Sequence, residues 1–188
     1  MLFRSAGGHA GVVIDVIKGL GGYEIVGLIE RAGKGSGSAH GCSIIGADDI
    51  LPGLRAKGVT EAANGVGSVR DNRPRRDVFR RLKDAGFVLP ALVHPTAWVA
   101  ESANLGDGVQ LMAGVLVQRG AQLAENVLVN TGAIVEHDCR ILAHAHICSG
   151  ARLGGDVVVG DSAFVGAGST IRQGIRVGDG AQIGRAHV

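Results

Sequence analysis

An aliphatic residue recurs at every sixth position through the second half of the chain. The series has fourteen positions and contains only Val, Leu or Ile. Its members are Val99, Leu105, Leu111, Val117, Leu123, Val129, Val135, Ile141, Ile147, Leu153, Val159, Val165, Ile171 and Val177. Four residues after most of them stands a small or β-branched residue, such as Ala103 or Val109.

This six-residue period predicts a parallel β-helix. An α-helix repeats its faces every 3.6 residues or so, and a half-buried strand alternates every second residue. Hexapeptide repeats are typical of a β-helix, in which each hexad supplies one short strand and one turn. Three hexads close a triangular coil, and the backbone hydrogen bonds run between coils. We predict a left-handed parallel β-helix of between four and five coils from the fourteen hexads.

Residues 6 to about 90 lack this frame and alternate between helical and extended patterns. A helix is predicted after the string AGGHA (6–10), with Val12, Val13, Val16 and Ile17 along one stripe. Extended segments follow in YEIVGLIE (23–30) and at the start of CSIIGADDILPGLRAKGV (42–59). An Arg-rich helix is predicted in PRRDVFRRLKDAGF (74–87). The alternation predicts a small Rossmann-like parallel sheet domain, so the fold class is α/β plus all-β.

Two glycines mark the start of the first predicted helix. Gly7 and Gly8 leave backbone N–H groups at a helix N-terminus, which favours a bound phosphate. The full GxGxxG fingerprint is absent, so a plain tight turn explains the two glycines equally well. Glu30 ends the next predicted strand, where related folds place an acid against a ribose. An exposed strand-end charge explains Glu30 equally well.

The two ends of the chain look foreign. MLFRS (1–5) and IGRAHV (183–188) match what a common sequencing adapter gives when it is translated. We therefore expect a Rossmann-like domain at 6–92 whose first strand is missing, and a β-helix at 93–182 whose last coil is missing.

Composition and charge exclude several classes of protein. Apolar residues make up 46% of the chain and the net charge is only +2, which argues against a nucleic-acid binder. The arginines around Arg75 are expected to form a solvated helix face. Three unpaired cysteines favour a reducing, cytoplasmic location. No apolar run is long enough to predict a membrane span, and no signal peptide is visible.

With the loop and the repeat established, the chain resembles the sialic acid O-acetyltransferase and UDP-4-amino-sugar N-acetyltransferase family. The strings AGGHA, VHPTAWV (93–99) and NTGAIVEHDC (130–139), together with the unbroken hexads, carry the resemblance. It implies acetyl-CoA as co-substrate and transfer of an acetyl group to an amine or hydroxyl of a sugar or nucleotide-sugar. It also implies a role in surface glycan biosynthesis and a homotrimer with sites between subunits.

The resemblance also implies roles for individual residues. His137 aligns with the general base, and Asp138 with an acid that orients it, where the family often has Glu. His146 aligns with a second histidine of the site. Gly155 aligns with a backbone N–H that would hold the thioester carbonyl, and Ala167 falls where the pantetheine arm is expected. The nucleotide-sugar is expected at Gly7, Gly8, His9, Glu30 and Asn130.

The chemistry suits these residue types. A neutral imidazole can accept a proton near pH 7, and a carboxylate on its other nitrogen fixes the tautomer. No metal is required.

Two alternatives stay open. His137, His144 and His146 could suggest a metal-dependent β-helix enzyme of carbonic anhydrase type, but spacings of seven, nine and two residues fit it poorly. A non-catalytic β-helix scaffold is disfavoured by the intact Glu-His-Asp triplet. His144 is expected to be an ordinary turn residue, and His40, in a Gly/Ser-rich loop, to be solvated.

Overall fold

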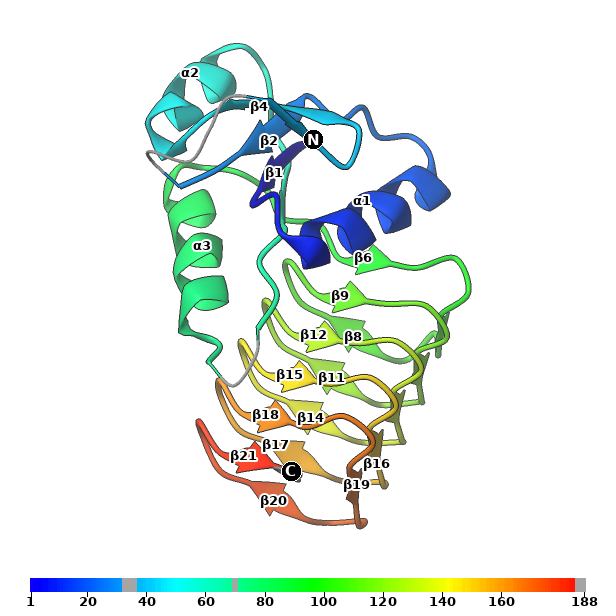
Figure 1. Ribbon diagram of the computed structural model, residues 1–188. Helices are drawn as coiled ribbons and strands as arrows, with labels where there is room; N and C mark the ends of the chain where they lie inside the picture. Colours follow the sequence, from blue (N-terminus) through cyan, green and yellow to red (C-terminus); the bar gives the residue numbers. More distant parts are fainter. Residues whose placement is uncertain (32–36, 69–70, 185–188) are drawn as a thin grey trace. The chain divides into compact units, whose positions relative to one another are not determined.

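The computed structural model describes residues 1–31, 37–68 and 71–184, which divide into two compact units (Figure 1). The first unit contains residues 1–67 and 74–90, and the second contains residues 68–73 and the chain from Ala91 onward. The boundary predicted at 92/93 falls inside a strand, β6 (Leu92–Val93). The short segment 68–73, which we had placed in the N-terminal domain, clusters with the second unit.

The first unit is built on a five-stranded sheet with the order β3-β4-β2-β1-β5. Its strands are β1 (Leu2–Arg4), β2 (Gly27–Ile29), β3 (Gly37–Ala39), β4 (Cys42–Gly46) and β5 (Ala62–Asn64). All neighbours pair in parallel except β3, which forms an antiparallel hairpin with β4. The sheet is therefore Rossmann-like with one antiparallel edge strand.

The first strand of the sheet, which the sequence analysis expects to be missing, is formed by residues near the N-terminus. Leu2–Arg4 form β1, which pairs with β2 on one side and β5 on the other. Leu2 and Phe3 can fill this central place because both are apolar, and both are fully buried. The foreign origin of residues 1–5 and 183–188 stays a prediction, and 185–188 lie outside the described residues.

Three α-helices and one short 3₁₀-helix accompany the sheet in the described part of this unit. They are α1 (Gly8–Leu20), η1 (Asp48–Ile50), α2 (Leu51–Ala56) and α3 (Arg73–Asp84). On α1 the buried face contains Ala10, Val13, Ile14 and Ile17, which recur at helical spacing. Val12, predicted to lie on this stripe, is 46% exposed because it points away from that face.

The predicted solvated face of the Arg-rich helix is wrong at one position. Arg75 is fully buried, and its Nη1 donates to the carbonyl oxygen of Val66 at 2.8 Å. Burial lowers the pKa of Arg75 to about 9. The same Nη1 lies 3.4 Å from the carbonyl oxygen of Asn64, so the backbone at the end of β5 contacts the buried guanidinium.

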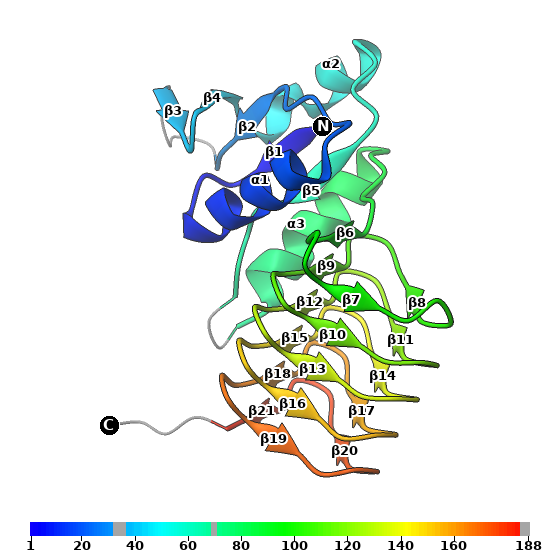
Figure 2. The same ribbon diagram turned by 90° about the vertical axis from the view of Figure 1, so that its right-hand side faces the viewer.

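The second unit is the predicted left-handed parallel β-helix. Its described part holds sixteen two-residue strands, β6 to β21, which stack into three sheets of five, five and six strands. Figure 2 shows two of these sheets as columns, β7-β10-β13-β16-β19 and β8-β11-β14-β17-β20. The third runs from β6 to β21 (Gln182–Ile183), so the repeat begins one hexad before Val99 and ends one hexad after Val177.

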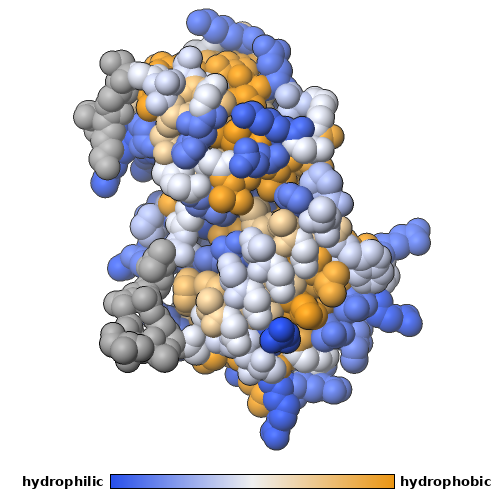
Figure 3. Space-filling model, turned by 45° about the vertical axis from the view of Figure 1, so that its right-hand side comes forward, coloured by the Kyte–Doolittle hydropathy of each residue, from blue (hydrophilic) through white to orange (hydrophobic). Residues whose placement is uncertain are grey.

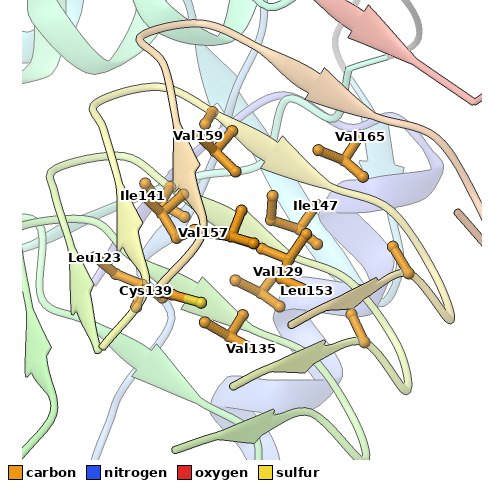
Figure 4. Close-up of a cluster of buried hydrophobic side chains, with 14 of the residues drawn as sticks. Leu123, Val129, Val135, Cys139, Ile141, Ile147, Leu153, Val157, Val159 and Val165 are labelled. Atoms are coloured by element: carbon orange, nitrogen blue, oxygen red, sulfur yellow. The ribbon is translucent and has the colours of Figure 1, made fainter. Parts of the chain in front are cut away.

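Each coil contains eighteen residues and sits in register on the next. Val117, for example, pairs with Val99 on one side and with Val135 on the other. The aliphatic positions and the small positions together fill one continuous core (Figure 4). Because each side chain is stacked on an equivalent one, the core needs no aromatic residues, in agreement with the low aromatic content.

Every corner of the prism is a two-residue turn whose second residue often has a positive φ. At one corner these second residues include Gly120 (φ 70°), Asp138 (60°), Asp156 (55°) and Gly174 (72°). A positive φ at the second central residue is the requirement of a type II turn, and glycine meets it without strain. Non-glycine residues adopt a positive φ less readily, yet Asn126, His144 and Ser162 also do so at equivalent turn positions of this β-helix.

The stacked core generates a stability prediction with a matched pair of residues. Ile147 is fully buried in a central coil, whereas Ile175 is 38% exposed near the end of the repeat. Ile147→Ala should lower the free energy of unfolding by about 2–5 kcal/mol. Ile175→Ala, the same chemical change, should cost less than about 1 kcal/mol. Denaturant titration at one protein concentration measures both, and equal losses would contradict the packing described here.

Candidate functional site

The predicted catalytic pair lies on one corner of the β-helix. His137 and Asp138 are the two central residues of the turn between β13 (Ile134–Val135) and β14 (Arg140–Ile141). His137 Nδ1 lies 2.9 Å from Asp138 Oδ2, and the two side chains are 48% and 63% exposed. The sequence places them near a turn on the outer surface, and the structure agrees.

This contact determines which nitrogen of His137 can act. A carboxylate accepts a hydrogen bond, so Nδ1 carries the proton and Nε2 keeps its lone pair. Nε2 faces the next coil, where it lies against Gly155. An ideal Cβ at position 155 would stand only 2.5 Å from Nε2 and 2.5 Å from Cε1. Gly155 therefore provides the space that the imidazole occupies, and its backbone lies beside Nε2.

His146 is not brought to this pair. It lies on β15 (His146–Ile147), in the sheet that runs from β6 to β21, and is only 3% exposed. Its Nδ1 hydrogen-bonds with Ser68 Oγ at 2.6 Å, and its ring meets Phe164 edge-on at 5.2 Å. Its Nε2 lies 3.7 Å from Cys148 Sγ. Burial raises the pKa of the Cys148 thiol to about 12, so this thiol is not ionised near neutral pH.

The partner of His146 belongs to a segment that sequence reasoning missed. Ser68 and Asn72 both contact the β-helix, since Asn72 Nδ2 donates to the carbonyl oxygens of Ser162 and Ala163 at 3.0 and 3.1 Å. Their sequence contains no local pattern that announces this role, because the contacts are made to coils 78 to 91 residues away. In this structure His146 holds Ser68 against the β-helix.

His144 occupies a turn, as expected, but it is buried. Its Nδ1 accepts a hydrogen bond from Asn126 Nδ2 at 3.0 Å, and Nε2 lies 3.9 Å from Glu125 Oε1. His137, His144 and His146 thus have three separate environments. Across residues 1–31, 37–68 and 71–184, no group of three His, Cys, Asp or Glu side chains gathers closely enough to hold a metal ion.

Asn130 and Ala167 lie on a different corner from the catalytic pair. Asn130 follows β12 (Leu128–Val129), and its Oδ1 accepts the backbone N–H of Thr131 at 2.8 Å. Ala167 is exposed in the turn after β18 (Phe164–Val165). Within one chain, the sheet containing β13 separates this corner from the corner of His137. The structure therefore does not join these two predicted groups inside a single copy.

The glycine loop of the first unit begins α1 without a side-chain cap. Gly7 is the N-cap residue and Gly8 the first helical residue, and both are exposed. No acidic side chain stands in the first turn. A helix start of this kind is favourable for an anion. His9 is half-buried and packs against Gly67, where an added Cβ would lie 3.0 Å from the His9 Cβ.

Glu30 lies beside the loop and on the wall of a cavity. Its Oε1 accepts the backbone N–H of Ala6, so it holds the loop in place. The cavity has a volume of about 350 Å³ and is lined by Arg4, Glu30, Arg31, Val66, Pro74, Asp77, Val78 and Arg81. Its size is within the range of small-molecule sites, and its lining carries three arginines beside two acidic residues, Glu30 and Asp77.

An ion-pair cluster supports one wall of this cavity. Asp48 accepts hydrogen bonds from Arg4, at 2.6 Å to Nε, and from Arg81. Burial by itself would raise the pKa of Asp48, but the hydrogen bonds and charges of Arg4 and Arg81 outweigh it and lower the pKa below its usual value. Asp48 therefore stays ionised and keeps both arginines in place.

His40 has a role that the sequence did not reveal. His40 and Gly41 form the two-residue turn of the β3–β4 hairpin, with φ values of 52° and 75°. Positive φ at both positions is typical of a type I′ turn. The imidazole Nε2–H reaches the carbonyl oxygens of Ala6 and Gly7, both at 3.1 Å. The expected solvated histidine is exposed, but it braces the glycine loop.

Residues 3–82 match the family described as the PglD N-terminal domain. A search of curated proteins finds no match.

Solved structures match almost the whole chain. The acetyltransferase domain of PglB from Neisseria gonorrhoeae, in complex with acetyl coenzyme A, is 35% identical with a TM-score of 0.86, over 96% of this chain and 85% of that one. PerB from Caulobacter crescentus, in complex with CoA and GDP-perosamine, is 34% identical with a TM-score of 0.81, over 98% and 88%. A histidine-to-alanine mutant of GDP-perosamine N-acetyltransferase from the same organism is 33% identical with a TM-score of 0.81, over 98% of this chain and 88% of that one.

These matches cover both units of this chain and 85% to 88% of each matched protein. The chain therefore belongs to the hexapeptide-repeat sugar acyltransferases, the family that includes perosamine N-acetyltransferase and the acetyltransferase domain of PglB.

Proposed function

We propose that this protein transfers the acetyl group of acetyl-CoA to an amine of a nucleotide-activated sugar, in the cytoplasm, for surface glycan biosynthesis. The observation that carries the proposal is the position of His137, whose Nδ1 contacts Asp138 and whose Nε2 lies against Gly155. An amine is favoured over a hydroxyl because the matched Caulobacter enzyme is named as an N-acetyltransferase and binds GDP-perosamine. Cys42, Cys139 and Cys148 are free thiols, which suits a reducing compartment.

The proposed reaction needs one proton transfer and one anion site. The sugar amine attacks the thioester carbonyl while His137 Nε2 takes the proton that the amine loses. Asp138 stabilises the resulting imidazolium through Nδ1. The backbone N–H of Gly155 is the donor proposed for the oxyanion. Collapse of the tetrahedral intermediate breaks the C–S bond and releases CoA, which takes up the proton.

The nucleotide is proposed to bind in the first unit. The loop at Gly7 and Gly8 would hold the diphosphate, and the cavity lined by Glu30, Arg31 and Arg81 would take the remainder of the nucleotide. The roles of His9 and Asn130 in sugar binding, and of Ala167 beside pantetheine, remain part of this proposal.

No helix in the described residues is both long and apolar enough to span a membrane.

A homotrimer is proposed because the site residues lie on two corners of one chain. A second copy can bring its own Asn130 or Ala167 corner to the His137 corner of the first. The sheet between these corners has an apolar outer stripe of Trp98, Leu116 and Ile134, aligned in register, and Trp98 is 51% exposed. Hydrophobic patches are visible among polar residues on the surface (Figure 3). Packing against another copy would cover such a stripe.

Replacing the proposed base tests the mechanism. His137→Ala should lower kcat by roughly a hundred- to ten-thousand-fold, because the amine then loses its proton without a positioned acceptor. Release of free CoA thiol measures turnover, with UDP- and GDP-linked 4-amino sugars, unmodified UDP-sugars and free sialic acid as acceptors. Turnover with sialic acid alone would move the proposal to O-acetylation. Full activity of His137→Ala with any acceptor would contradict the catalytic role.

The brace on the glycine loop generates a second prediction. His40→Ala should raise the KM for the nucleotide-sugar about two- to tenfold, since two modest hydrogen bonds no longer hold the loop. The KM for acetyl-CoA is the internal control and should not change. Gly11→Ala should give the same effect, because an added Cβ would lie 2.7 Å from His40 Nδ1 and displace the ring. It should do so while stabilising the helix. Unchanged KM values in both variants would show that the brace is irrelevant to binding.

The apolar stripe generates a third prediction. Leu116→Glu places a charge at the centre of the stripe and should convert a trimer into single chains, because burying an unpaired charge is costly. Thr170→Glu introduces the same charge on the same sheet beyond the stripe and should leave the trimer intact. Sedimentation equilibrium distinguishes these states. A wild-type protein that sediments as a monomer, or a trimeric Leu116→Glu variant, would refute the proposed interface.

A further inference from the structure

The Asp138 carboxylate rests on the coil before it. At the corner that carries the catalytic pair, Gly120 occupies the place of Asp138 one coil earlier. An ideal Cβ at position 120 would overlap Asp138 Oδ1 and would lie 3.5 Å from its Cγ. The carboxylate therefore fills the space that any larger residue at position 120 would need.

The backbone on both sides of this contact is fixed. The N–H of Asp138 donates to the carbonyl oxygen of Arg119 at 3.0 Å, and the N–H of Gly120 donates to Ser102 Oγ at 3.2 Å. Because neither backbone can shift without breaking these bonds, only the Asp138 side chain can give way. Rotation of the side chain about χ1 would move the carboxylate off His137 Nδ1.

We propose that Gly120 is a positioning residue for the catalytic pair: it leaves open the space in which the Asp138 carboxylate must lie to hold His137. With Gly155 on the opposite side of the imidazole, the pair is seated between two glycines of neighbouring coils. This inference rests on the proposed function of His137 and Asp138. Gly120 touches neither substrate in this role and acts only through Asp138.

The same corner provides a matched control. Gly174 has φ 72°, against 70° for Gly120, so alanine strains both backbones equally. Among the described residues, and apart from its own chain neighbours, no heavy atom lies within 4 Å of an ideal Cβ at Gly174. The variants Gly120→Ala and Gly174→Ala therefore differ in the contact with Asp138 and share the backbone cost.

The experiment measures kcat and both KM values for Gly120→Ala, Gly174→Ala, Asp138→Ala and the double variant Gly120→Ala/Asp138→Ala. Gly120→Ala should lower kcat about tenfold or more at unchanged KM, since small displacements of a catalytic group have effects of this size. Gly174→Ala should keep the wild-type kcat while losing the same amount of thermal stability. In the Asp138→Ala background, Gly120→Ala should cause no further loss of kcat, because no carboxylate remains to be displaced.

Additive losses in the double variant would overturn the proposal, because Gly120 would then act independently of Asp138. A kcat for Gly120→Ala equal to that of Gly174→Ala would overturn it as well. If Gly120→Ala does not fold, Gly120→Asn and Gly174→Asn replace the alanine pair, because asparagine tolerates the left-handed region. His137→Ala separates the two levels of inference. Its full activity would remove the proposed mechanism and Gly120 with it, whereas its inactivity beside a fully active Gly120→Ala would remove only the role of Gly120.

Discussion

The backbone hydrogen bonds between successive coils are the constraint on which the rest of this structure depends. Every strand of the β-helix pairs in parallel with the strand eighteen residues away, as Val117 does with Val99 and Val135. This pairing forces each coil to have the same length and the same corners. Side chains on one corner therefore form columns, and the proposed catalytic residues belong to one such column. Residues eighteen positions apart share one position of the turn, so the neighbours of His137 in the adjacent coils are set by their sequence numbers. At this position stand Glu101, Arg119, His137, Gly155 and Gln173.

Most of the β-helix could be predicted because its repeat is strictly local. A single aliphatic position every six residues determines the strand, the inward side chain and the coil. The sequence analysis missed only one strand at each end, β6 and β21. The N-terminal sheet was predictable in type, but Val12 and Arg75 were misplaced. The exposure of Val12 and the burial of Arg75 depend on how each helix packs within its unit, and no short-range pattern encodes this.

In the candidate site, too, some features follow from the local repeat and others depend on contacts between distant segments. The exposed turn position of His137 and Asp138 follows from the hexad frame. The contacts of His146 with Ser68, and of His40 with the loop at Gly7, do not. Both join segments tens of residues apart, and each histidine occurs in a string that has no distinctive spacing. His146 illustrates the physical limit: a family alignment can assign it to a site, whereas its neighbours in this chain engage both ring nitrogens.

The stacking of Gly155 on His137 has a consequence for how such a protein can change over time. The proposed base and the proposed oxyanion donor are adjacent only because eighteen residues make one coil, and the coils are about 4.8 Å apart. The number of residues between positions 137 and 155 thus determines whether the two groups lie in register. A deletion of one residue anywhere in that interval leaves both groups chemically intact but moves them out of register by one position of the turn. Substitutions in this stretch are constrained mainly by packing, whereas changes of length are tolerated only as loops that bulge outward at a turn and return the chain to register.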